Sequence, residues 1–452
     1  MLDEILKPED VLQKYRTILK ETDPILPLGR VTEVNGISIL SYGPPDTSIG
    51  QLCRVEPSGH SPILCEVTGF RNNQLILMPF GSTEGIYPSA TVHNTGRRMS
   101  IHTSIDLLGR TLNGMGQPMD GKPPILTGEV RPADANPPDP ISRKPIDSVL
   151  VTGVRAIDGL LTVGRGQRLG IFAGTGVGKS TTLGMIARYT RADVNVICLV
   201  GERGREVREF IEKDLGPDGL KRSVLVVATS DRSAIEKVYA ALFATTIAEY
   251  FRDQGMHVNL LMDSVTRYCM ALREIGIATG DQLGPGGYPP AVWYKLSRLV
   301  ERSGVSSKGT ITGFYSILVE ADDMNDPVAD ATRGILDGHI ILSRRLAKRN
   351  HYPSIEVPDS ISRVMDQVIS ADHKTKADLL KSWISAYQEN EEIVNLGAYA
   401  RGSNHDLDLY LQKQKEINNF LRQSIDQGLT FDQTLDQLDQ LTHIVKDEED
   451  EF

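Results

Sequence analysis

The stretch FAGTGVGKSTT, residues 172–182, decides the fold. It fits the pattern of a phosphate-binding loop, with Ala173 in the position that is usually glycine. The run RLGIFA before it is typical of a buried strand, and STTLGMIARYT after it is typical of a helix. A strand, a glycine-rich loop and a helix in this order indicate a parallel α/β domain that holds the phosphates of a nucleotide.

Each residue type in the loop suits the binding of phosphate or of its Mg²⁺ ion. The glycines let main-chain N–H groups close around a phosphate without interference from a Cβ. Lys179 is expected to reach the β- and γ-phosphates, and Ser180 to bind Mg²⁺. The alternative, a glycine-rich turn with an exposed lysine, fits the flanking strand and helix poorly. The predicted nucleotide-binding residues of the loop are Ala173, Gly174, Thr175, Gly176, Val177, Gly178, Lys179, Ser180 and Thr181.

Acidic residues follow two further predicted strands. Asp263 ends the apolar run in HVNLLMDS, where a phosphate loop needs a carboxylate for the Mg²⁺ shell. Glu202 stands just past the strand in VICLVGERGREVREF, at the edge of the sheet where ligands bind. We therefore predict Glu202 as the general base, with Arg203 as a further catalytic residue and Glu206 as a further metal ligand close by. The later charges of this run are expected on a solvated helix face.

The 452 residues suffice for two or three domains. Short β-prone runs separated by turn residues predict a small β-barrel over residues 25–96. Strand and helix patterns alternate from about residue 150 to 365, and we assign residues 97–365 to this α/β domain. The Pro- and Gly-rich stretch at 113–145 is expected to be an irregular linker. Residues 366–452 are expected to be helical, with a possible capping box at Thr430 and Gln433. The predicted fold is thus an α/β core between a barrel and a helical domain.

Residues 1–24 are expected to form a short amphipathic helix. Its apolar positions recur at helical spacing, but so short a helix is marginal alone. It either packs on its own domain or binds a partner, and the sequence leaves both open. The apolar positions are Val11, Leu12, Tyr15, Ile18 and Leu19.

Composition narrows the function classes. The formal net charge of −10 argues against nucleic acid as a partner, because neutralising phosphates needs a basic surface. The N-terminus has no basic region followed by a long apolar stretch, and no run of apolar residues is long enough to span a membrane. We expect a cytoplasmic protein.

At this point the sequence resembles a known family. The segments GERGREVREFIEKDLGPDGL, MDSVTRYCMALREIG, VEADDMNDPVADATRGILDGHIILSR and LGAYARGSN are similar to those of the ATPases of bacterial type III protein export. The resemblance runs over about residues 25–425, and it extends in plan to the rotary ATP synthase catalytic subunit: a β-barrel, a RecA-like core and a helical C-terminal domain. The run VRAIDGLLTVGRGQRLGIFAGTGVGKS resembles flagellar members more than virulence-injectisome members.

The resemblance implies hydrolysis of ATP with Mg²⁺. It places Lys179, Glu202 and Asp263 at the phosphate-loop lysine, the catalytic glutamate and the Mg²⁺-shell aspartate. It also places Tyr352 where related enzymes stack a tyrosine on adenine, although a core tyrosine is the alternative. Arg363 matches an arginine finger supplied to the neighbour's nucleotide, expected on the far side of the sheet's carboxyl edge from the loop; a surface salt bridge is its alternative.

The resemblance further implies a homohexameric ring, peripheral at the inner-membrane export apparatus. The implied partners are a stator-like regulator at the N-terminal helix, a stalk-like protein in the bore, the export gate, chaperones and exported subunits. One stretch, DQLGPGGYPPAVWYKL, departs from the flagellar pattern, with Pro285 and Gly286 where Thr-Arg is usual. An injectisome ATPase, an ATP-driven RNA translocase and a non-catalytic rotary subunit are the alternative functions.

Overall fold

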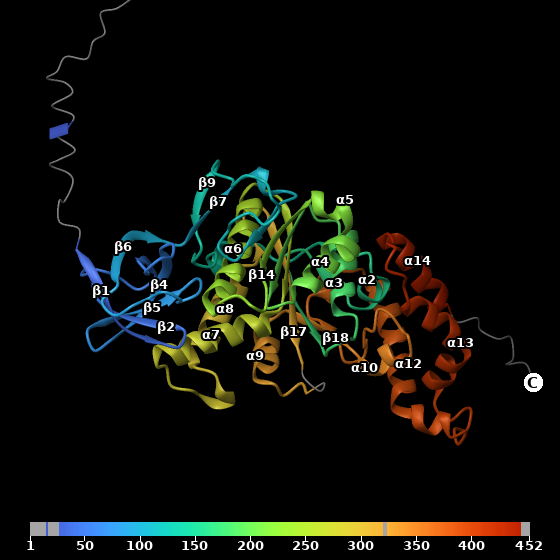
Figure 1. Ribbon diagram of the computed structural model, residues 1–452. Coiled ribbons are helices and arrows are strands. Elements are labelled where there is room, and N and C mark those ends of the chain that lie inside the picture. The colour runs from blue at the N-terminus through green and yellow to red at the C-terminus, as the bar shows by residue number, and fades with distance from the viewer. Residues whose placement is uncertain (1–14, 17–26, 320–322, 444–452) are drawn as a thin grey trace, which may run out of the picture. The chain divides into compact units, whose positions relative to one another are not determined.

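The structure is a computed structural model that describes residues 15–16, 27–319 and 323–443 (Figure 1). The chain divides into two compact units, Met1–Met99 and Ser100–Phe452. The amphipathic helix predicted over residues 1–24 lies outside the described residues, apart from a helical pair at Tyr15 and Arg16. Among the described residues, no helix has both the length and the apolar character needed to cross a membrane.

The first unit holds a closed barrel with the strand order β1-β2-β5-β4-β3-β6. The side chains that alternate into its interior are small and branched apolar residues, among them Val31, Ile39, Cys53, Cys65 and Val67. The predicted barrel is therefore confirmed. Its strands are β1 Leu28–Asn35, β2 Ser38–Tyr42, β3 Gln51–Val55, β4 Ile63–Arg71, β5 Gln74–Pro79 and β6 Thr91–Arg98.

The second unit is built on a nine-stranded sheet in the order β19-β18-β12-β17-β15-β13-β14-β8, with β16 beside β17. The central strands run parallel and are buried on both faces, so they read as continuous apolar runs. The strands are β8 Thr111–Asn113, β12 Arg168–Ala173, β13 Val194–Val200, β14 Ser223–Ala228, β15 His257–Asp263, β16 Gly304–Val305, β17 Thr310–Leu318, β18 Gly338–Leu342 and β19 Ile361–Ser362.

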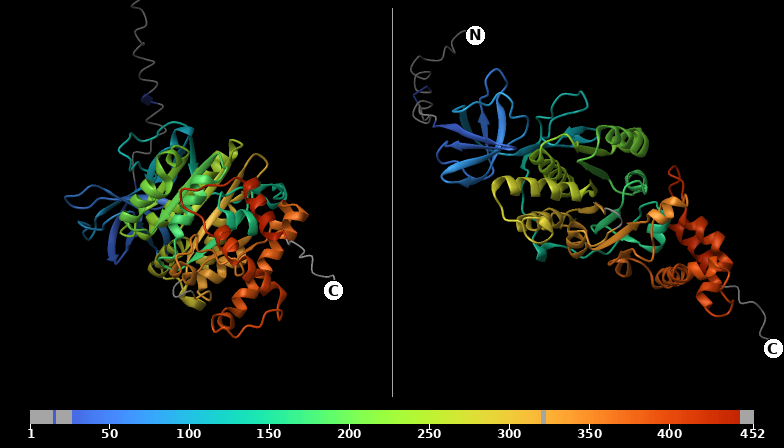
Figure 2. Two further views of the ribbon diagram at one scale, coloured as in Figure 1. Left: turned by 90° about the vertical axis from the view of Figure 1, so that its right-hand side faces the viewer. Right: turned by 60° about the horizontal axis from the view of Figure 1, so that its bottom comes forward.

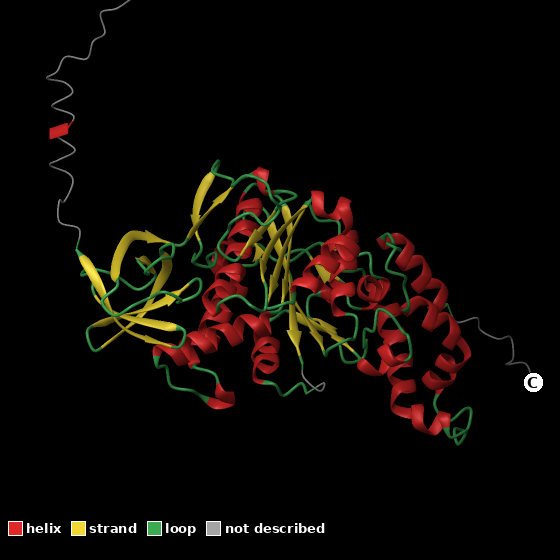
Figure 3. Ribbon diagram, viewed as in Figure 1, coloured by secondary structure: helices red, strands yellow, loops and turns green. Residues whose placement is uncertain are grey.

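Helices cover both faces of this sheet (Figure 3). Helices α6 and α7 pack on one face, and α3, which follows the phosphate loop, lies on the other (Figure 1). The helices of the core are α2 Arg155–Leu160, α3 Lys179–Tyr189, α4 Gly204–Glu209, α5 Gly216–Lys221, α6 Ala234–Asp253, α7 Val265–Thr279, α8 Pro290–Glu301, α9 Pro327–Ile335, α10 Arg344–Lys348 and α11 Met365–Val368.

Three helices, α12 Ala371–Asn395, α13 His405–Leu421 and α14 Phe431–Thr442, pack together beyond the core and contact α2 (Figure 2). The predicted capping box is confirmed, because Thr430 and Gln433 bond each other's main-chain N–H groups at the start of α14. The stretch 113–145 is less irregular than predicted. Its segment β9, Glu129–Pro132, pairs with β7, Ser100–Thr103, and two-residue strands β10 (Val149–Leu150) and β11 (Val163–Gly164) pair just after it.

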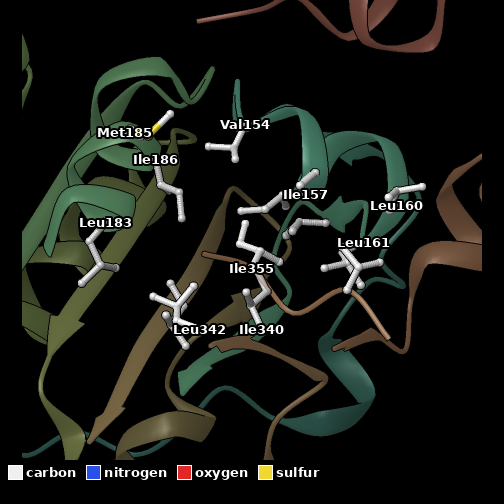
Figure 4. Close-up of a cluster of buried hydrophobic side chains, with 14 of the residues drawn as sticks. Val154, Ile157, Leu160, Leu161, Leu183, Met185, Ile186, Ile340, Leu342 and Ile355 are labelled. Carbon is white, nitrogen blue, oxygen red and sulfur yellow. The ribbon is translucent and has the colours of Figure 1, made fainter. Parts of the chain in front are cut away.

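One apolar cluster joins the sheet to the helices around it. Figure 4 shows Ile340 and Leu342 of β18 facing Ile355, with Ile157 of α2 above them. Ile355 belongs to the segment 351–357, whose main chain bonds the end of β18 through Ser354 and Glu356. This segment is thereby held against the phosphate loop, which follows the neighbouring strand β12.

Candidate active site

The residues predicted for nucleotide chemistry converge at one edge of the sheet. Strands β12, β15 and β13 are parallel, so their carboxyl ends lie together. The phosphate loop follows β12, Glu202 follows β13, and Asp263 ends β15. A cavity of about 1100 Å³ opens at this edge, lined by the loop, Glu202, Arg203, Glu206 and Tyr352. Its volume is that of a pocket for a ligand the size of a nucleotide.

The loop takes a shape that only glycine adopts without strain. Gly176 has φ 78° and Gly178 has φ 87°, both in the left-handed region. Gly178 is also the N-cap of α3, so the first N–H groups of the helix face the loop's concave side. Successive N–H groups in such a turn form a nest for an anion, and the helix dipole adds to its positive potential.

Lys179 joins two carboxylates at the floor of the cavity. Its Nζ lies 3.3 Å from Oε1 of Glu202 and also bonds Oδ1 of Asp263. The Ser316 hydroxyl, on β17, donates to the same Oδ1 at 2.6 Å and fixes the aspartate. Burial alone lowers the pKa of Lys179, but the two carboxylates outweigh it and hold the pKa above its ordinary value. The lysine is therefore a fixed cation.

Glu202 has the electrostatics of a base that works near neutral pH. Burial raises its pKa to about 7, against the opposing attraction of Lys179. Glu206 shares a hydrogen bond with it, and this bond lowers the pKa of Glu206. The Glu206 carboxylate also accepts the main-chain N–H of Arg203 at 3.4 Å, which starts α4. Arg203 itself is exposed at the rim of the cavity, 3.5 Å from Glu206.

Tyr352 forms another wall of the cavity, and 41% of its surface is exposed. Two of its ring atoms lie 3.3 Å from where a Cβ on Gly178 would stand, so the ring covers the loop directly. Its carbonyl accepts the N–H of Gln423, which follows α13. A flat, partly exposed ring beside a phosphate loop suits stacking on a base.

The cavity includes residues that the sequence did not single out. Gln423, Ser424 and Ile425 come from the turn between α13 and α14, and Arg267 comes from α7. Arg267 lies in MDSVTRYCMALREIG, four residues after Asp263, so its place in the motif was a usable signal. The turn after α13 gives no local sign that it lines the same cavity as a loop some 245 residues earlier in the chain.

Arg363 does not reach this cavity. Its N–H bonds the carbonyl of Asp337, and its guanidinium donates to the carbonyls of Leu336 and Arg333. These lie at the amino-terminal end of β12 and β18, because β19 runs antiparallel to β18. Arg363 is therefore on the far side of the sheet from the loop, at the amino-terminal edge. With six residues in β12, Arg363 is about 20 Å from its own chain's phosphate loop.

The side chains suit a Mg²⁺ ion shared with a nucleotide. Within the described ranges, no cluster of three or more His, Cys, Asp or Glu forms a protein-only metal cage. Mg²⁺ in nucleotide sites needs only one or two protein oxygens, since phosphates and water supply the rest. The hydroxyl of Ser180, exposed at the start of α3, and the carboxylate of Asp263 are of the required kind.

The segment that departs from the flagellar pattern forms a tight turn. Pro285–Gly287 is a single 3₁₀ turn, and Gly286 and Gly287 have φ 73° and 76°. A Cβ on Gly286 would lie 2.6 Å from the ring of Pro327, so this turn needs glycine. It lies outside the nucleotide cavity.

Comparison with known proteins agrees with this architecture. The β-barrel domain of the ATP synthase alpha/beta family matches residues 31–96, and the nucleotide-binding domain of that family matches residues 153–362. The C-terminal domain of the type III secretion ATPase EscN matches residues 369–440. These three matches cover the barrel, the core and the helical domain in turn.

Two relatives that match nearly the whole chain have the same sequence identity to it. The chain is 47% identical to the flagellum-specific ATP synthase of Bacillus subtilis, over 94% of this chain and 97% of that one. It is also 47% identical to the type 3 secretion system ATPase of Xanthomonas euvesicatoria, over 92% and 94%. Among solved structures, assembled EscN of enteropathogenic Escherichia coli has a TM-score of 0.88 at 43% identity, over 92% of this chain and all of that one. EscN in complex with its central stalk EscO has a TM-score of 0.85 at 42% identity, with the same coverage.

Proposed function

The chain belongs to the family of flagellum-specific ATP synthases and type III secretion ATPases, and from this premise we propose how its residues hydrolyse ATP and what the hydrolysis drives. It is an ATPase of the ATP synthase alpha/beta family, and its 47% identity to flagellar and type 3 secretion ATPases over nearly their whole length favours this function over an RNA translocase or a non-catalytic subunit. The flagellar and secretion relatives are equally identical to it, so the choice between those two roles is part of the proposal.

The proposed mechanism divides the work among three groups. The loop N–H groups and Lys179 hold the β- and γ-phosphates, and the ring of Tyr352 stacks on adenine. Ser180 and Asp263, with Glu206 as a further ligand, would hold Mg²⁺, which would supply positive charge against the charge that develops on the phosphates. Glu202 accepts a proton from the attacking water, and its pKa near 7 suits that task.

One observation carries this mechanism: the contact of Lys179 with Glu202 and Asp263 beneath the loop. Lys179→Ala should abolish both nucleotide affinity and phosphate release. Lys221→Ala is the matched control, because Lys221 is an exposed lysine paired with Asp218 on α5 and does not line the cavity. Titration with a fluorescent ADP analogue measures affinity. If Lys179→Ala binds ADP as the wild type does, the loop does not hold the phosphates.

We infer a homohexameric ring in which Arg363 acts on the neighbour's nucleotide. EscN is described as an assembled ATPase, and Arg363 here lies about 20 Å from its own loop. A guanidinium that is too far from its own site can stabilise a γ-phosphate only across a subunit boundary. Such fingers contribute about 10³–10⁵ in rate.

Mixing two inactive variants tests the trans role. Arg363→Ala retains an intact loop, and Lys179→Ala retains an intact finger. A mixed ring therefore contains sites that combine the wild-type halves, and part of the turnover should return. Arg333→Ala, a neighbouring arginine paired with Asp330, should stay active without mixing. Absence of recovery in rings shown to contain both chains would rule out the finger.

For the biological role, we propose export of flagellar subunits by the type III apparatus. The run VRAIDGLLTVGRGQRLGIFAGTGVGKS supports the flagellar choice, and injectisome secretion is the alternative. The ring would then be cytoplasmic and peripheral at the inner membrane. Its partners would be a stalk in the bore, as EscO is for EscN, a stator-like regulator at the N-terminal helix, the export gate, chaperones and exported subunits. Restored motility in a strain lacking its flagellar ATPase would support this role, and restored secretion in an injectisome mutant alone would overturn it.

A further inference from the structure

A buried hydroxyl reaches into the phosphate loop from the segment 351–357. Ser354 Oγ donates to the carbonyl oxygen of Val177 at 2.6 Å. Ser354 is fully buried and Val177 is 1% exposed, so water does not compete for this bond. Neither residue lines the nucleotide cavity, whereas Gly176, Gly178 and Lys179 do. The bond therefore reaches the loop from the side opposite the cavity.

The position of this bond fixes the direction of a neighbouring donor. A trans peptide unit is planar, and its C=O and N–H point in opposite directions. Because the Val177 carbonyl points to Ser354, the Gly178 N–H points the other way, to the cavity side. That N–H belongs to the group of main-chain donors that a phosphate loop offers to its ligand.

Without such a bond, the peptide unit between Val177 and Gly178 is free to flip. A flip changes ψ of Val177 and φ of Gly178 together. Glycine accepts φ of either sign, so the backbone of Gly178 does not itself oppose such a flip. A flipped unit would direct a carbonyl oxygen toward the phosphates in place of an N–H, and two electronegative groups would then face each other.

The serine is itself held firmly. Its carbonyl accepts the N–H of Ser343 at 2.8 Å, at the end of β18. The next side chain, Ile355, is buried against Ile340 and Leu342 (Figure 4). Because its support is rigid, the Ser354 hydroxyl can hold the Val177 carbonyl in one position, as a side chain on a mobile loop could not.

We propose that Ser354 is a positioning residue for nucleotide binding, which holds the Gly178 N–H toward the phosphates by bonding the Val177 carbonyl. The proposal rests on the proposed use of the loop as the nucleotide site. Ser354 touches no substrate, so its loss weakens binding of the ground state and the transition state alike. Such a change raises KM and leaves kcat nearly unaltered.

The test compares two serine deletions in the same stretch of chain. Ser354→Ala removes the bond to the loop. Ser360→Ala removes another buried hydroxyl, which donates to the Glu356 carbonyl at 2.6 Å and accepts the Ile341 N–H at 2.9 Å, both outside the loop. ADP affinity of the full chain is measured by calorimetry, with KM and kcat for MgATP and the melting temperature alongside.

Ser354→Ala should weaken ADP binding and raise KM by about two- to tenfold, as expected for one intramolecular hydrogen bond. Both variants should have a lower melting temperature than the wild type, because each loses a buried hydrogen bond. Ser360→Ala should nevertheless bind ADP with the affinity of the wild type. Equal ADP affinities in Ser354→Ala and the wild type, or an equal loss in both variants, would overturn the positioning role. If Ser354→Ala does not fold, Ser354→Cys, of similar size but a weak donor, must show the same loss of affinity. Failure of the wild type to bind ADP would instead refute the proposed function.

Discussion

Replacing Glu202 by glutamine tests two effects of its carboxylate, one on the rate of ATP hydrolysis and one on the stability of the folded protein. Glutamine has the same shape and keeps a carbonyl oxygen that Lys179 can reach at 3.3 Å, so the cavity should keep its form. It cannot accept a proton from water. Loss of a general base costs about 10²–10⁴ in rate, so kcat should fall by that factor while ADP affinity changes little.

The same change should stabilise the protein, but only at higher pH. The pKa of Glu202 in the folded chain is raised to about 7, above its ordinary value, so the folded state binds more protons than the unfolded state between those two values. The contribution of Glu202 to stability is therefore complete at low pH and is lost as the pH rises through 7. Glutamine has no such titration, and its advantage at pH 8 should be on the order of 1–3 kcal/mol.

Two measurements check these expectations. The kcat/KM of the wild type at saturating Mg²⁺ should rise with pH through about 7, because the base must be ionised in the free enzyme. The residual activity of Glu202→Gln should lack this rise. Melting temperatures at pH 5 and pH 8 should show the stability gain at pH 8 alone. A variant that retains a third of wild-type turnover, or a stability gain that is largest at pH 5, would refute the reasoning.

Three further changes probe other parts of the chain. Tyr352→Ala should raise KM for ATP by about tenfold through lost stacking, whereas Tyr352→Phe should not; an unchanged KM in both would leave the ring as a structural residue. Gly178→Ala should weaken ADP binding, because alanine at φ 87° costs about 1–2 kcal/mol and its Cβ meets the tyrosine ring, whereas Gly334→Ala, in open space on α9, should bind normally. Deleting residues 1–20 should preserve basal ATP hydrolysis and weaken binding of a regulator in a pull-down; global unfolding of the truncated chain would favour a helix packed on its own domain.

Much of the fold was predictable because its signals are local. The strands β12, β13 and β15 appear as unbroken apolar runs, since helices bury them on both faces. The barrel strands appear as short runs between turn residues, and the capping box at Thr430 is a four-residue pattern. The pairing of β9 with β7 was missed because proline and glycine surround a strand of only four residues.

The site was predictable where residues follow strands, and not where distant segments meet. Glu202 and Asp263 follow apolar runs, so parallel topology alone brings them to Lys179. The sequence did not indicate that Arg363 lies at the amino-terminal edge of the sheet, because the direction of the two-residue strand β19 leaves no trace in its composition. The bond from Ser354 to the loop spans 177 residues, and no local pattern encodes such a contact.

Alternating side chains in the segment 351–357 link the loop to the helical domain. Side chains two apart share a face. Ile355 and Val357 are apolar residues of the core, and Ser354 and Glu356, which alternate with them, are also buried. Ser354 bonds the loop, and Glu356 bonds Arg345 on α10 and Gln388 on α12. Since buried carboxylates need such partners, the helical domain cannot move away without breaking these bonds. A shift of this segment therefore changes the loop's donors and the hold on α12 together.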